Sequence, residues 1–100
     1  MADFTKAGSD KGDVEKQLKH LLISANLTYH SYIAVIEDLS KEELEGDLRE
    51  YVEQYTLEIL PMVKKIEAEE NDKLIEKANE IKKIYENLIK EIKDKIKETN

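Results

Sequence analysis

Residues 14–39 read VEKQLKHLLISANLTYHSYIAVIEDL, and their apolar side chains recur at every third or fourth position. This spacing gathers them on one side of an α-helix, whereas a strand would alternate them. No Gly or Pro interrupts the stretch. The apolar positions are Val14, Leu18, Leu21, Leu22, Ala25, Tyr29, Tyr32, Ile33, Ile36 and Leu39. The sequence therefore predicts a first amphipathic helix over about residues 14–39, with Asp13 as its N-cap.

Two further helical patterns follow, each after a capping signal. Ser40 and Glu43 have the spacing of a capping box, which predicts that the second helix begins near residue 41. Its apolar stripe continues in phase across Pro61, so we expect a helix over about residues 41–70 that is kinked at Pro61 and not broken. Asn71 then supplies a stop and Asp72 an N-cap, which predicts a third helix over about residues 73–98.

The phases of these stripes predict how the helices are arranged. At 100° per residue, the second and third stripes differ by roughly 90°, so one straight helix could not place both on a common core. Short connections then favour an all-α, up-down-up antiparallel three-helix bundle over residues 13–100. In this bundle Tyr29 should lie opposite Tyr51, to within one turn. Residues 1–12 are polar and aperiodic, and we expect them to form a flexible N-terminal tail.

Composition narrows the class of protein. The chain has 100 residues, a net charge of −7 and no cysteine. A negative charge argues against nucleic acid as a partner, because phosphate binding needs clustered Lys and Arg. The absence of cysteine suits a reducing compartment, and residues 1–13 lack the apolar core of a signal peptide. We therefore expect one acidic, cysteine-free domain, located in the cytoplasm and without a membrane span.

The most informative functional feature is a run without charge. From His20 to Ile36 no side chain is charged, although 39% of the residues in the chain are. A helix needs only one side to face its core, so an uncharged outer side indicates that something else covers it. The residues predicted to form this protein interface are His20, Ile23, Ser24, Leu27, His30, Ser31 and Ala34. Cover by the N-terminal tail, through Phe4, is the alternative within the chain itself.

Other candidate sites in the sequence are weak. His20 and His30 are ten positions apart, roughly 15 Å along a helix, which is too far to ligate one metal. The acidic clusters near the helix ends lack the ligand pattern of a calcium loop. There is no nucleotide-binding motif and no nucleophile paired with a base. We therefore predict no catalytic, metal or cofactor residues, and no enzymatic activity. Leu57 and Leu60, off the stripe near Pro61, are a possible second contact patch.

These observations favour a non-enzymatic interaction module. It would form a homo-oligomer, or bind another helical protein, by burying the uncharged side of its first helix. One alternative is an acidic inhibitor or immunity-type protein that binds a basic site on a target protein. A second is a carrier of a small apolar ligand within a tyrosine-lined core. A third is an engineered protein without a biological role, although Gly46 and Pro61 are residues that a designer of ideal helices would avoid.

Overall fold

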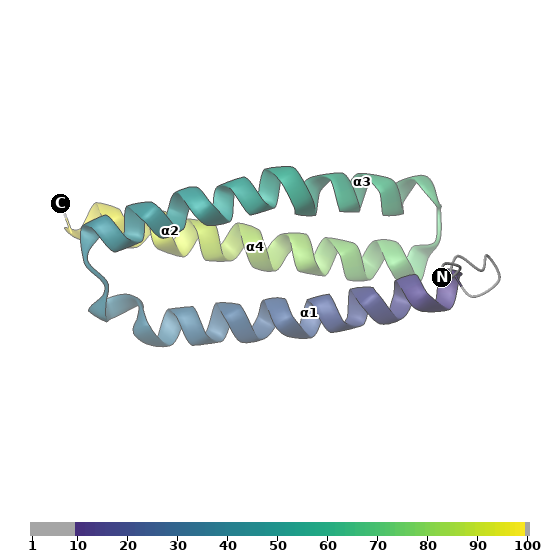
Figure 1. The fold of residues 1–100 in the computed structure, drawn as a ribbon, viewed down its shortest axis with the longest axis horizontal. Coiled ribbons are helices and arrows are strands. Elements are labelled where there is room, and N and C mark those ends of the chain that lie inside the picture. The colour runs from purple at the N-terminus through teal and green to yellow at the C-terminus, as the bar shows by residue number, and fades with distance from the viewer. Residues whose placement is uncertain (1–9, 100) are drawn as a thin grey trace, which may run out of the picture.

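The computed structural model describes residues 10–99, with side chains from Asp13 onward. It is an all-α, up-down-up antiparallel bundle of three helical rods, as the sequence predicts (Figure 1). The first rod is α1 (Asp10–Val35), extended by the 3₁₀ turn η2 (Ile36–Asp38). The second comprises α2 (Lys41–Gln54), the π-helical segment η3 (Tyr55–Ile59) and α3 (Leu60–Ala68), and the third is α4 (Asp72–Thr99). No strand occurs among the described residues.

Helix α1 begins earlier than its sequence pattern predicts. Asp10, Lys11 and Gly12 are helical, so the prediction of a flexible tail over residues 1–12 is wrong for its last three residues. A glycine in the first turn costs only about 1 kcal/mol, and the carboxylate of Asp13 is favourable in a first turn as well as at an N-cap. The remainder of the predicted tail, with Phe4, lies outside the described residues.

The start of α2 is set by a local motif. The backbone N–H of Glu43 donates to the Ser40 hydroxyl at 3.1 Å, and the backbone N–H of Ser40 donates to the Glu43 carboxylate at 2.8 Å. This is the capping box that the sequence predicts. It satisfies two backbone donors that the helix itself cannot pair, and so ends the η2 connection at a defined residue.

Pro61 is accommodated by a change of helix type. The chain stays helical through it, and the preceding segment η3 has the wider π-helical turn. The backbone N–H of Leu60 donates to the Tyr55 carbonyl, five residues back. A proline ring collides with the carbonyl four residues before it and brings no N–H of its own. One additional residue in the turn moves the carbonyl away from the proline ring without ending the rod.

The turn into α4 differs by one residue from the prediction. Glu70 has φ of 55°, so it is Glu70 that leaves the helical conformation and ends α3. The Asn71 side chain accepts from the backbone N–H of Lys73 at 3.1 Å and of Leu74 at 3.4 Å. Asn71 is therefore the N-cap, and Asp72, predicted to have that role, is the first residue of α4. A carboxylate there is favoured by the helix dipole.

Helix α4 is the centre of the bundle. Both α1 and the second rod pack against α4, whereas α1 approaches α2 and α3 only sparsely. Ile81 and Ile92 of α4 are completely buried, in an aliphatic core that runs the length of the molecule. Between α1 and α2 the rings of Tyr32 and Tyr51 meet edge to face, with centroids 5.9 Å apart. Tyr32, and not the predicted Tyr29, thus has this role, a shift of about one turn.

A single substitution at Gly46 should stabilise the fold. A methyl group added at Gly46 would meet nothing within 4 Å. Because alanine lowers the backbone entropy of the unfolded chain, we expect Gly46→Ala to raise the free energy of unfolding by about 1 kcal/mol. Urea denaturation with an unchanged m-value will measure this difference. A free energy of unfolding equal to or below that of the wild type would contradict the assignment of Gly46 to an unstrained, open helix position.

Candidate functional site

The predicted interface residues lie on the exposed side of α1, and one of them, His30, is at the border of this side, where it lines a hollow with Ile84 and Asn87 of α4. We call this side the outer face of α1, and all its members are exposed: His20, Ile23, Ser24, Leu27, His30, Ser31 and Ala34. The exposed fraction is 52% for Ile23 and 62% for Leu27. On the opposite side of the same helix, Ala25 is only 3% exposed. The helical periodicity thus separates a buried side from an uncharged, accessible one.

The structure adds an apolar residue to this region. Val35 is 46% exposed, one turn after Ser31. A shallow groove runs between α1 and α2 beside the outer face, lined by Leu27, Thr28, Ser31, Tyr32, Val35 and Tyr51. Val35 was not predicted as an interface residue, although it belongs to the uncharged run. The groove could not be predicted, because it lies between two helices whose relative placement depends on tertiary packing.

Two tyrosine hydroxyls connect neighbouring rods at the border of the core. Tyr32 of α1 donates to the Asp47 carboxylate of α2 at 2.8 Å. Tyr55 of η3 donates to the Glu86 carboxylate of α4 at 2.5 Å. Burial first, and then the hydrogen bond to a carboxylate, raises the pKa of the Tyr32 hydroxyl above its ordinary value. The same two causes raise the pKa of Tyr55 to about 12.

These raised pKa values predict loss of stability in alkali. An unfolded tyrosine ionises around its ordinary pKa of 10.0, whereas folded Tyr55 keeps its proton until about 12. The stabilisation of the fold by these protonated tyrosines is therefore complete below pH 10, and it is lost as the pH rises through the pKa of the folded state. Circular dichroism and tyrosinate absorbance, recorded together, should show unfolding as the pH rises from 10 to about 12. The variant with Tyr32→Phe and Tyr55→Phe should lose less stability over the same range. An identical loss in this variant would contradict the assignment.

The two histidines occupy separate places along the outer face. The His30 ring packs edge-on to the Tyr29 ring, with centroids 5.5 Å apart. His20 borders a surface hollow beside Lys16, Lys19 and Ile23. In the described part of the chain, no group of three or more His, Asp or Glu side chains is arranged to hold a metal ion. Both histidines are exposed, and both belong to the uncharged run of α1.

Leu57 and Leu60 differ in their surroundings. Leu57 is 68% exposed and lies in a hollow of η3 and α2 bordered by Glu50, Glu53 and Glu58. Leu60 is half-buried. An exposed leucine surrounded by carboxylates carries a water shell that opposes apolar contact, unlike the uncharged surroundings of Leu27.

A pocket of about 210 Å³ opens between α1 and α3. Its lining residues are Val14, Gln17, Leu18, Leu21, Met62, Lys65, Ile66 and Glu69. The walls are thus mainly aliphatic, and none of the five tyrosines contributes to them. This differs from the tyrosine-lined cavity that a ligand-carrier interpretation of the sequence assumes.

An ion pair connects η2 with α4. The Lys95 ammonium donates to the Glu37 carboxylate at 2.8 Å, and Glu98 lies at 3.4 Å from the same nitrogen. The hydrogen bond to Glu37 raises the pKa of Lys95. Because Glu37 is drawn toward α4, its charge is directed away from the outer face. Asp38, the next residue, remains exposed at this end of η2.

Two further questions about function concern membrane insertion and similarity to known proteins. No helix in the described range 10–99 combines the length and the apolar character needed to cross a membrane. Comparison of the chain with protein-family models, curated proteins and solved structures found no match.

Proposed function

We propose that this protein is a non-enzymatic interaction module that self-associates through the outer face of α1. The observation that supports this most is the exposure of a helix side without charge from His20 to Ala34, on a chain in which 39% of residues are charged. Ile23 and Leu27 supply the apolar area that becomes buried. His20, Ser24, His30 and Ser31 supply hydrogen-bonding groups around it, as the polar rim of an interface does.

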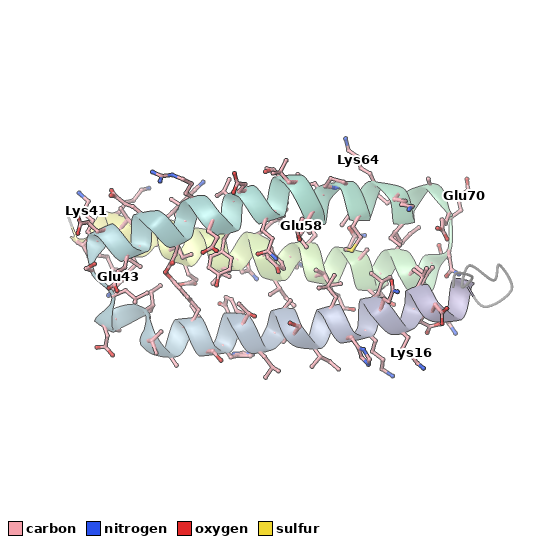
Figure 2. All side chains as sticks on the ribbon, in the orientation of Figure 1. Lys16, Lys41, Glu43, Glu58, Lys64 and Glu70 are labelled. Carbon is pink, nitrogen blue, oxygen red and sulfur yellow. The ribbon has the colours of Figure 1, made fainter. Side chains whose placement is uncertain are left out.

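The net charge favours this face over the others. Each copy carries a charge of −7, so two copies repel wherever their carboxylates meet. Exposed carboxylates lie on the rest of the bundle, as the labelled Glu43 of α2, Glu58 of η3 and Glu70 of the turn before α4 illustrate in Figure 2. Over the length of His20 to Ala34, two copies can approach without placing like charges in contact.

The size of the face sets the expected affinity. From His20 to Ala34, α1 extends about 21 Å, and a helix with its side chains is about 10 Å wide. This patch is smaller than the roughly 800 Å² per partner that typical stable complexes bury. We therefore expect association with a dissociation constant in the micromolar range.

Sedimentation equilibrium tests the proposal on the unmodified chain. The mean mass should rise from monomer toward dimer between about 1 μM and about 300 μM. Salt screens both the repulsion between two copies of charge −7 and the attraction between opposite charges at the ends of the face, so these opposing effects should change the midpoint little. A monomer at every concentration would contradict self-association. A monomer that instead binds a basic protein with strong salt dependence would support the acidic-inhibitor alternative.

A further inference from the structure

We propose that two copies pair α1 against α1 in antiparallel orientation, about a two-fold axis that passes beside Leu27. This inference rests on the proposed self-association and adds the partner segment, its direction and its register. The partner is a second copy of this chain. Two observations on the described residues carry the inference: the order of side-chain sizes along the outer face and the charges at its two ends.

Side-chain sizes along the outer face are balanced around Leu27. In the antiparallel pair, Leu27 packs on Leu27 of the second copy. The next layer on each side combines Ile23 and Ser24 of one copy with His30 and Ser31 of the other. Each such layer therefore holds two large and two small side chains, which is the complementarity that close packing needs. In the outermost layer, the imidazole of His20 lies opposite the small Ala34.

Opposite charges flank the uncharged face at equal distances. Lys16 precedes Leu27 by as many positions as Asp38 follows it, and both residues are exposed. Lys16 points away from the other two rods (Figure 2). Neither residue forms an ion pair within the described part of the chain. In the antiparallel register, each Lys16 meets Asp38 of the second copy, so two ion pairs close the ends of the interface.

A parallel pair of the same helices would be unfavourable. It would place Lys16 against Lys16 and Asp38 against Asp38, which are like-charge contacts. It would also pair the two His20 rings at one end and the two Ala34 methyl groups at the other, which leaves one end crowded and the other poorly filled. The antiparallel pair avoids both problems, and the helix dipoles then oppose each other favourably.

Single cysteines test the register directly, because the unmodified chain contains none. A disulfide requires Cα atoms within about 7 Å. Leu27→Cys should therefore form a disulfide-linked dimer on mild oxidation. Ile23→Cys should not, because its two copies lie about 12 Å apart along the helix axes. When the Ile23→Cys variant is mixed with the His30→Cys variant, a disulfide should form between the two variants, and both still contain Leu27. Leu57→Cys is the control for random collision.

Charge reversal provides a second test that is independent of packing. Lys16→Glu should weaken dimerisation about tenfold, because each end of the interface then holds two carboxylates. Asp38→Lys should weaken it similarly, even though it makes the net charge less negative. The double variant keeps the net charge of −7, and its dissociation constant should return to within about threefold of the wild type.

The outcomes separate this pairing from the broader proposal. The antiparallel register is supported if Leu27→Cys cross-links and Ile23→Cys does not, and if the double charge variant regains the dissociation constant of the wild type. A dimer in which Ile23→Cys links as readily as Leu27→Cys overturns it in favour of a parallel pair. A dimer that links best through Leu57 overturns it in favour of another face. A chain that is monomeric by sedimentation overturns the self-association itself.

Discussion

Leu27→Glu will leave this protein folded but monomeric. Leu27 is 62% exposed in the bundle, so a glutamate there remains hydrated in the monomer, and the free energy of unfolding should change by less than about 0.5 kcal/mol. In the proposed dimer the same carboxylate is buried without a partner, and it faces its own copy across the two-fold axis. A buried, unpaired charge costs several kcal/mol, so the dissociation constant should rise by at least about 100-fold.

The control for this experiment is Leu57→Glu. Leu57 is 68% exposed, and the substitution introduces the same charge and the same loss of apolar surface at a site away from α1. We expect its sedimentation profile to match the wild type apart from a slight effect of net charge. Equal weakening in both variants would show that the added charge acts through general repulsion, and the outer face of α1 would lose its special role. Circular dichroism verifies that both variants remain helical.

Ile81→Ala will have the largest effect on folding. Ile81 has an exposed fraction of 0% and lies in α4, the helix that both other rods contact. Removal of a buried aliphatic side chain loses its transfer free energy and leaves a cavity that neighbouring residues fill only in part. The expected loss is about 2–5 kcal/mol, a large part of the roughly 5–15 kcal/mol that stabilises a domain of this size. Urea denaturation will measure it.

Ile23→Ala is the matched control, because it makes the same change in a helix at a residue that is 52% exposed. In dilute, monomeric protein we expect its free energy of unfolding to stay within about 0.5 kcal/mol of the wild type, since alanine also favours the helix. At concentrations that favour the dimer, Ile23→Ala should weaken association. If Ile81→Ala and Ile23→Ala lowered the free energy of unfolding of the monomer by similar amounts, this would contradict the arrangement of buried and exposed sides.

The bundle itself was predictable from local patterns. The period of three to four between apolar residues specifies helices and their buried sides, since a helix places such positions on one side whatever surrounds it. The capping box at Ser40 and Glu43 was likewise predictable, because both partners lie within one turn. The same periodicity predicted the outer face, and the structure places all its residues in exposed positions.

Finer details of the rods could not be predicted with the same certainty. The stop at Glu70 and the cap at Asn71 involve neighbouring residues that are all capable of these roles, and the geometry of the turn selects among them. The π-helical segment before Pro61 is one of several ways to relieve the same steric conflict. A shift of a helix end by one or two residues changes the free energy little, so sequence patterns specify the ends of helices weakly.

By itself, then, the sequence determined the three helices, their order and the uncharged side of α1, because these follow from interactions within a few residues of each other. Only the tertiary structure decided that Tyr32 meets Tyr51, that Lys95 reaches Glu37, and that a groove lies between α1 and α2. These features depend on how three rods settle around α4, whose buried side chains set the distances between the helices.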